Sequence, residues 1–159
     1  MRLHSMYEFK SGFEIFLKNF IHNSTDIKDD YHFHDEYEIF LVLSGYIQYN
    51  VEGEVLSLGP KDCVIISPNT FHGKTSIKSD NVTYTTIYIG EEFFSTNNCL
   101  DYKNIFLKSQ EKLQYKITKE VCENSGFYNA YERLKKYSDD FENLDKQIAT
   151  NTISEMLYI

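Results

Sequence analysis

The amino-acid sequence predicts a mainly β domain, built as a sandwich or barrel of short strands and followed by a pair of C-terminal helices. Two observations carry this prediction. Strand-type apolar segments recur at short intervals between residues 31 and 89, and residues typical of turns separate them. Beyond Thr118 the apolar residues take on helical spacing instead. Many short strands with regular turns favour a sandwich or barrel over alternating strand–helix units.

The first predicted strand runs from Phe13 to Phe20, where apolar and aromatic residues are dense, and the polar residues 22–30 are expected to form a loop. Six more strands are predicted at 31–34, 37–43, 46–51, 54–58, 63–67 and 82–89. Turns that contain glycine lie between several of them, at Gly45, Gly53 and Gly59. The apolar residues of segment 105–117 indicate one more strand or a hairpin.

Four large apolar residues show the helical spacing of the C-terminal region: Phe127, Tyr131, Leu134 and Phe141. Gly126 is expected to end a short helix just before them. Asp139, with Glu142 three residues later, is typical of the N-cap and capping box of a last helix. The apolar stripe of that helix widens after Ile153, which indicates burial on two sides and favours a homodimer partner on one of them. Because the sequence stops at Ile159 without a C-cap glycine or a basic last turn, we expect a fragment of a longer protein.

Composition and charge exclude several classes of function. The chain of 159 residues has the length of one domain, and its aromatic content of 16% suits strands and a ligand-lined interior. Because its net charge is -8, the chain is not expected to bind a nucleic-acid backbone through these 159 residues. Three cysteines without a Cys-x-x-Cys pair indicate neither a disulfide framework nor a thiolate zinc site. The sequence shows no signal-peptide core and no membrane-spanning apolar run, so we expect a cytoplasmic protein with no membrane partner.

The residues that carry chemistry are concentrated in the run His32-Phe33-His34-Asp35-Glu36-Tyr37-Glu38. His32, His34 and Glu38 share one parity, so on an extended strand their side chains point to the same side. His72, further along the chain, can close the set. Buried imidazoles and carboxylates are retained where they bind a ligand or satisfy one another. Because three imidazoles and one carboxylate suit a divalent transition metal such as Zn, Fe, Mn or Ni, these four residues are candidate metal ligands.

The spacing His32-x-His34-x3-Glu38-x6-Gly45 resembles the first cupin motif at each of these positions. The leading glycine of that motif is replaced by Asp26. In the second cupin motif Asp62 and His72 match, whereas its two glycines and its proline are replaced by Lys61, Asn69 and Ser67. The cupin resemblance covers about residues 25–90.

A narrower resemblance is to the N-terminal sensor domain of AraC-type transcriptional regulators. It rests on four pieces of sequence: His-x-His-x3-Glu-Ile at 32–39, an apolar strand ending at Ser44-Gly45, Leu58-x-Pro60-x-Asp62, and Pro68-Asn69-Thr70-x-His72. The resemblance implies a cupin fold, that is a double-stranded β-helix or jelly-roll barrel, in residues 1–117 with an N-terminal arm. It implies a helical dimerisation and linker segment in residues 118–159, and a small effector, sugar-like by default, bound in the barrel. DNA is expected to be reached only through a DNA-binding domain beyond residue 159.

The resemblance makes His32, His34, Glu38 and His72 candidate ligand-binding residues as well as candidate metal ligands. Tyr84 and Tyr88 alternate on one face of a strand, and two interpretations stay open for them: half-buried packing, or a hydrogen-bonding wall that contacts the effector. His4 and His22 lie among polar residues and are expected to be solvated.

The alternative function is a small metal-dependent cupin enzyme, a dioxygenase or an isomerase, with its metal on the same four residues. No separate general acid or base stands out in the sequence. We therefore expect a sensor domain and not an enzyme.

Overall fold

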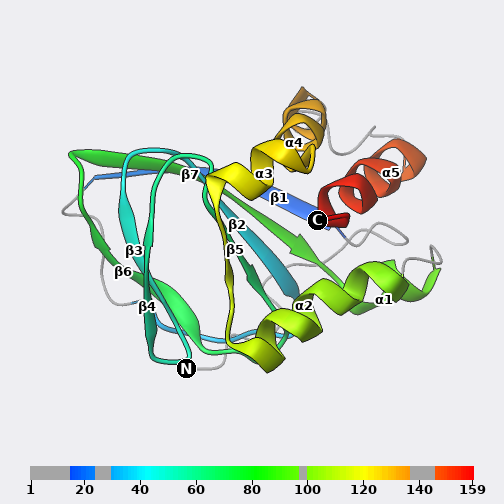
Figure 1. Ribbon diagram of the computed structural model, residues 1–159, viewed down its shortest axis with the longest axis horizontal. Helices are drawn as coiled ribbons and strands as arrows, with labels where there is room; N and C mark the ends of the chain where they lie inside the picture. The colour runs from blue at the N-terminus through cyan, green and yellow to red at the C-terminus, as the bar shows by residue number, and fades with distance from the viewer. Residues whose placement is uncertain (1–14, 24–29, 97–99, 137–145) are drawn as a thin grey trace.

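A computed structural model describes residues 15–23, 30–96, 100–136 and 146–159 (Figure 1). Two antiparallel sheets face each other, and the helices gather on one side of the larger sheet (Figure 1). This mainly β architecture with a helical C-terminal part confirms the predicted fold class. Within the described ranges, no helix is long and apolar enough to cross a membrane.

In the part of the chain that the structure describes, five strands form the larger sheet, in the order β1-β7-β2-β5-β8, and every neighbouring pair is antiparallel. Their bounds are β1 Ile15–Asn23, β7 Asn81–Ile89, β2 Tyr37–Ser44, β5 Cys63–Ile66 and β8 Lys116–Ile117. Three strands form the smaller sheet, in the order β4-β3-β6. Their bounds are β4 Glu54–Leu58, β3 Ile47–Val51 and β6 His72–Ile77.

The two faces of the larger sheet have different roles because side chains alternate along each strand. Ile39 pairs with Ile65 and Ile87, and this row faces the helices. The neighbouring row, centred on Glu38, faces the interior between the two sheets. Large apolar side chains fill much of that interior: Phe40, Tyr49, Leu56, Leu58, Ile66 and Tyr84. Burial of this cluster by both sheets holds the sandwich closed.

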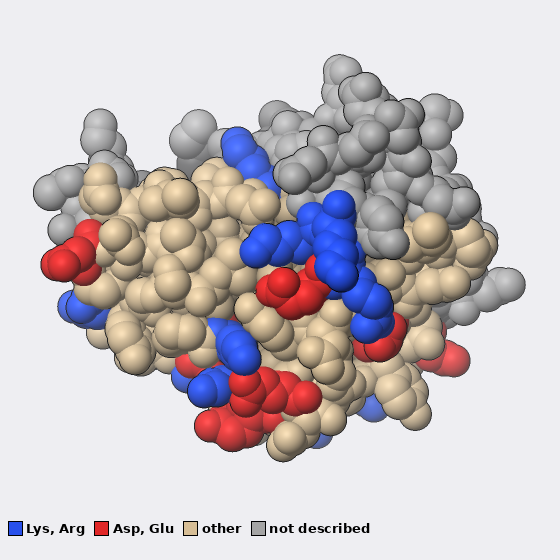
Figure 2. All heavy atoms as spheres, turned by 90° about the horizontal axis from the view of Figure 1, so that it is seen from above, with Lys and Arg blue, Asp and Glu red and all other residues tan. Residues whose placement is uncertain are grey.

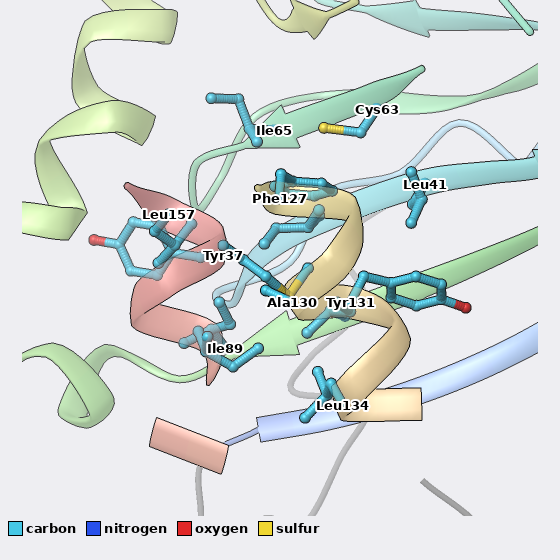
Figure 3. Close-up of a cluster of buried hydrophobic side chains, with 14 of the residues drawn as sticks. Tyr37, Leu41, Cys63, Ile65, Ile89, Phe127, Ala130, Tyr131, Leu134 and Leu157 are labelled. Carbon is cyan, nitrogen blue, oxygen red and sulfur yellow. The ribbon is translucent and has the colours of Figure 1, made fainter. Parts of the chain in front are cut away.

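The helices of the described ranges, α1 to α5, pack on the outer face of the larger sheet (Figure 1). Their bounds are α1 Glu91–Thr96, α2 Leu100–Lys112, α3 Lys119–Asn124, α4 Phe127–Lys136 and α5 Lys146–Leu157. A second apolar cluster lies between these helices and the larger sheet. It includes Tyr131 and Leu134 of α4 and Leu41 of β2 (Figure 3). The predicted helical spacing of α4 is confirmed, and Gly126, with φ of +82°, separates α3 from α4 as expected.

The apolar stripe of α5 is buried inside this chain. Four residues of the helix belong to the cluster under the sheet: Ala149, Ile153, Met156 and Leu157. The stripe is therefore covered to a large extent by α4, α2 and the sheet, and a homodimer partner stays a prediction. Asp139 and Glu142, which were expected to mark the start of the last helix, lie outside the described residues, as does Phe141.

Two predictions for the C-terminal half of the barrel and its connection to the helices were wrong. The segment predicted as a strand or hairpin at 105–117 is mostly helix α2, and only Lys116–Ile117 forms a strand. Phe106 of α2 is fully buried against the sheet, and Ile105 beside it packs on the same cluster, so the apolar pair serves a helix face. Strand β6 was not predicted because its sequence, HGKTSI, is mostly polar and lacks apolar alternation.

Two boundaries in the N-terminal half also differ from prediction. Strand β1 continues to Asn23, which pairs with Asn81, so the predicted loop of 22–30 begins later. The strand predicted at 31–34 is reduced to the isolated bridge residues His32 and Phe33, and His32 pairs with His72. The residues that follow in the chain do not extend this pairing into a strand, because the chain bends at residues 35–36 before β2 begins.

Basic and acidic side chains are mixed on the surface. On the face shown in Figure 2, a short strip of basic side chains has acidic side chains directly beside it. Lys61 pairs with Glu123 at 2.6 Å, and Arg133 of α4 pairs with Glu155 of α5. Such pairs neutralise basic groups that a phosphate backbone would otherwise attract.

Candidate functional site

The four residues predicted to act together do lie together, and we call them the four-residue site: His32, His34, Glu38 and His72. His32 and His34 belong to residues 30–34, here called the bridge segment, which crosses the start of β6. Glu38 is on β2 in the larger sheet, and His72 begins β6 in the smaller one. The site therefore joins the two sheets at one end of the interior.

The bridge segment lies directly on Gly73 of β6. A Cβ atom at Gly73 would be 2.9 Å from the Cα atom of Tyr31 and 3.0 Å from the carbonyl oxygen of Asp30. Only a residue without a side chain permits this approach. The carboxylate of Asp30 also accepts a hydrogen bond of 2.8 Å from the amide of Lys74 and forms an ion pair with its ammonium group. These contacts fix the segment that carries His32.

Each of the three imidazoles has the same local anchor. The Nδ1 atom donates to a backbone carbonyl two residues away: His32 to Asp30, His34 to Glu36 at 3.1 Å, and His72 to Thr70 at 2.7 Å. A carbonyl oxygen can only accept, so the proton of each neutral ring is on Nδ1. The lone pair of each neutral ring is consequently on Nε2, the atom left for ligation.

The Nε2 atoms of two rings converge on one carboxylate oxygen. Glu38 Oε2 lies 2.9 Å from Nε2 of His34 and 3.1 Å from Nε2 of His72. A lone pair on nitrogen and a carboxylate oxygen are both acceptors, so a contact of this length requires a proton or a metal cation between them. All four residues offer ligand atoms within 4.8 Å of one another.

The environment shifts the pKa values in directions that agree with this geometry. Burial alone would lower the pKa of His34, but the hydrogen bond to Glu38 and the charges of Glu38 and Glu36 raise it. Burial alone would raise the pKa of Glu38, but the charges and hydrogen bonds of His72 and His34 hold it well below its usual range. Burial is the main cause that lowers the pKa of His32. Glu38 is thus an anion that requires positive charge beside it.

The donor set fits a divalent transition metal. His34 and His72 are each 1% exposed and Glu38 is 3% exposed, so the donors are already removed from water. The Nε2 atom of His32 is buried and has no hydrogen-bond partner among the described residues, which leaves it free to ligate. Three imidazole nitrogens and one carboxylate oxygen are ligands that Zn, Fe, Mn and Ni accept.

Two further residues support the site, and the sequence analysis did not single them out. Tyr49 on β3 donates a hydrogen bond of 3.3 Å to the other carboxylate oxygen of Glu38. Glu36 is 3% exposed, and its Oε2 atom lies 3.3 Å from Nδ1 of His34. The shared parity of His32, His34, Glu36 and Glu38 could have indicated Glu36 from the sequence. No local signal indicated Tyr49, which depends on pairing between distant strands.

The two predicted tyrosines lie at different distances from the site. Tyr88 pairs with Glu38 in the sheet, and its ring centroid is 5.5 Å from that of His34. Tyr84 lies deeper in the interior, where its ring packs 4.6 Å from Phe40 and 5.0 Å from Phe20. Tyr84 is thus packed in the interior and Tyr88 borders the four-residue site, and contact of either tyrosine with an effector stays a prediction.

One expectation about the remaining histidines was wrong. His22 is half-buried, and its ring centroid lies 5.6 Å from that of Tyr84. It is not solvated because β1 extends past it and turns its side chain towards the interior. His4 lies outside the described residues.

Comparison with known proteins supports the same fold. The family profile described as the AraC-like ligand binding domain matches residues 21–135. No curated protein sequence matches the chain.

Several solved structures, cupins among them, are similar to this chain at low sequence identity. A cupin protein from Bacteroides fragilis is 17% identical with a TM-score of 0.46, covering 51% of this chain and 70% of that one. An RmlC-like cupin with a double-stranded β-helix fold from Methanocaldococcus jannaschii is 13% identical with a TM-score of 0.45, covering 54% and 90%. The DMSP lyase DddQ from Ruegeria pomeroyi is 19% identical with a TM-score of 0.44, covering 49% and 39%.

Proposed function

Since the chain belongs to the AraC-like ligand-binding domain family, we propose that it is the ligand-sensing part of an AraC-type transcriptional regulator. The observation that carries the proposal is the four-residue site, a buried polar cluster between two sheets, next to a cluster of buried apolar side chains. A small effector binds at this site, and a sugar is the default that the family suggests. Tyr88 borders the bound effector.

The same strands that hold the site also carry the helices. Along β7, Tyr88 faces the site, whereas Thr85 faces outward and its hydroxyl lies 2.7 Å from that of Tyr131 on α4. A change in the distance between β2 and β7 at the site is therefore transmitted to α4 through this contact. An effector that binds one arrangement of sheet and helices more tightly than another shifts the balance between them.

In this proposal the C-terminal helices of residues 118–159 form a homodimer, and α4 and α5 relay the bound state to it. DNA is reached through a DNA-binding domain outside residues 1–159, and the regulator acts in the cytoplasm. The exposed large apolar side chain of Ile148 on α5, at 42% exposure, is one group that such an interface would cover.

A metal-dependent cupin enzyme is the second candidate function, because the donor set of the four-residue site suits a catalytic metal. Catalysis requires an open coordination position and access for substrate. The match of residues 21–135 to the AraC-like ligand binding domain favours the sensor.

Thermal-shift screening of the purified chain tests the proposal, with sugars, amino acids and divalent metal ions as the ligands. A sensor is expected to show a raised melting temperature with at least one ligand, which is recovered unchanged. Conversion of that ligand to a product by the chain would instead support the enzyme.

A further inference from the structure

A cavity lies between α2 and the C-terminal end of α5. Its volume is about 520 Å³, within the range of about 300–1,000 Å³ that is typical of pockets for small organic molecules. Both helices pack on the outer face of the larger sheet (Figure 1). The cavity is therefore separate from the four-residue site, which lies between the two sheets.

The most buried residues that line this cavity from α5 and the middle of α2 are apolar. Leu157 of α5 is 3% exposed and belongs to the apolar cluster between the helices and the larger sheet. Ile105 of α2 packs against the same cluster, and Tyr102 beside it is half-buried. Tyr158 lines the cavity as an exposed side chain. A ligand with an apolar or aromatic body is suited to such a surface.

The wall that α2 forms is fixed before any ligand binds. Phe106 of α2 is fully buried, and its carbonyl oxygen accepts a hydrogen bond of 3.1 Å from the hydroxyl of Ser67. At the end of the helix the amide of Gln114 donates to the carbonyl of Ser109 at 2.9 Å, and the Ser109 hydroxyl donates back to the carbonyl of Gln114. Binding against a fixed wall loses less conformational entropy than binding against a mobile one.

Two lysines give one end of the cavity a positive charge. Lys108 and Lys112 line the cavity from α2, and they are four residues apart, so they share one face of the helix. Both are exposed, and neither forms an ion pair with another residue of the described ranges, whereas Lys103 of the same helix pairs with Glu91. In a chain with a net charge of -8, two adjacent lysines without an acidic partner favour an anionic ligand group.

The single acidic residue among those that line the cavity defines the orientation of such a ligand. Asp101 lies seven residues before Lys108, which is about 10 Å along the axis of a helix. Its carboxylate repels an anion at that end, whereas Lys108 and Lys112 attract it at the other. Ile105 lies midway along the same face, where it can contact the apolar body of the ligand.

We propose that this cavity is a second ligand site, which binds a small organic acid with an apolar or aromatic body. The carboxylate of the acid lies between the ammonium groups of Lys108 and Lys112, and its body packs on Ile105 and Leu157. Because the acid contacts α2 and α5 together, it holds the end of α5 against α2. This site is additional to the proposed sensor function, and does not depend on which ligand occupies the four-residue site.

The test is isothermal titration of the purified chain with hexanoate, phenylacetate and 4-phenylbutyrate. We expect at least one acid to bind at one site per chain, and its neutral amide to bind less tightly. The double variant Lys108→Gln with Lys112→Gln is expected to weaken binding of that acid about 10-fold. Lys78→Gln with Lys119→Gln removes the same two charges at exposed lysines outside the cavity, and should leave the affinity unchanged.

Amide chemical shifts of the labelled chain locate the bound acid. Changes confined to α2 and residues 157–159 support the second site. Changes in β2 and β6 instead would place the acid at the four-residue site and overturn the inference, while the sensor function would stand. The inference would also be overturned by equal affinities of the wild type and the Lys108→Gln, Lys112→Gln variant, or by no binding of any of the three acids.

A dilution series of the chain without ligand tests the other occupant of such a cavity. If the amide signals of α2 and residues 157–159 change with protein concentration, a second copy of the chain covers the cavity, and a small acid is not its ligand. Signals that stay constant over the dilution, together with binding of an acid, support the proposed site.

Discussion

His32 and His72 hold each other in place through their backbones: each amide donates a hydrogen bond of 2.9 Å to the carbonyl of the other. Their ring centroids lie 4.6 Å apart. The pair joins the bridge segment to β6 by a single bridge outside the regular strands. Two ligands from distant parts of the sequence are thereby placed by main-chain geometry, so their separation does not depend on side-chain packing alone.

Gly73→Ala tests this placement. The added Cβ would meet backbone atoms of the bridge segment at 2.9–3.0 Å, so the segment must move. We expect a loss of about 1–3 kcal/mol in the free energy of unfolding, together with weaker metal binding as His32 is displaced. Urea unfolding and chelator competition measure the two effects. Thr75→Ala at an exposed position of the same strand is the control, and an equal effect in both variants would count against the close approach at Gly73.

Tyr49→Phe removes the hydrogen bond to Glu38 Oε1 while keeping the packed ring. Burial raises the pKa of Tyr49 well above its usual value, so the hydroxyl stays protonated and donates. We expect the metal-free protein to lose about 1 kcal/mol of stability, measured by urea unfolding. Tyr46→Phe, at a residue that is 58% exposed, should change stability little. Equal stability of Tyr49→Phe and wild type would show that this hydroxyl does not support the carboxylate.

The contact between Thr85 and Tyr131 is expected to couple the sheet to α4. Thr85→Val and Tyr131→Phe each remove one hydroxyl of the 2.7 Å hydrogen bond. A double-mutant cycle on urea unfolding should give a coupling free energy of about 0.5–1.5 kcal/mol. Additive effects of the two substitutions would mean that the contact contributes no coupling, and that the sheet and α4 communicate through apolar packing alone.

Metal affinity should fall as pH is lowered, because metal ions and protons compete for the same lone pairs. The raised pKa of His34 means that its proton competes at higher pH than in a free imidazole. The lowered pKa of Glu38 means that its carboxylate remains ionised as the pH falls through the range in which histidines titrate. Chelator competition between about pH 8 and about pH 6 should show a steadily weaker affinity. An affinity that is constant over this range would exclude the histidines as ligands.

Local sequence patterns predicted most of the barrel and the grouping of the site. The parity of His32, His34 and Glu38 follows from the period of two along a strand, and the three side chains still converge although residues 31–34 form isolated bridges and no regular strand. Helix α4 followed from the spacing of Phe127, Tyr131 and Leu134, because its apolar face is sharply defined.

The features that escaped prediction depend on tertiary contacts. Strand β6 is polar, and is held by pairing with β3. Helix α2 was taken for a strand because short apolar runs fit both periods. Tyr49 reaches Glu38 only because β3 and β2 come from opposite sheets that face each other. The filling of the interior by Phe40 and Tyr84 likewise arises from the packing of both sheets.

Anomalous diffraction from crystals of the chain grown with Zn²⁺ tests the central claim most directly. Data at the zinc absorption edge should show one strong peak between the imidazoles of His32, His34 and His72, about 2.0–2.2 Å from their Nε2 atoms and a carboxylate oxygen of Glu38. A map with no peak there, or with a sugar-shaped organic density in its place, would contradict metal binding by these four residues.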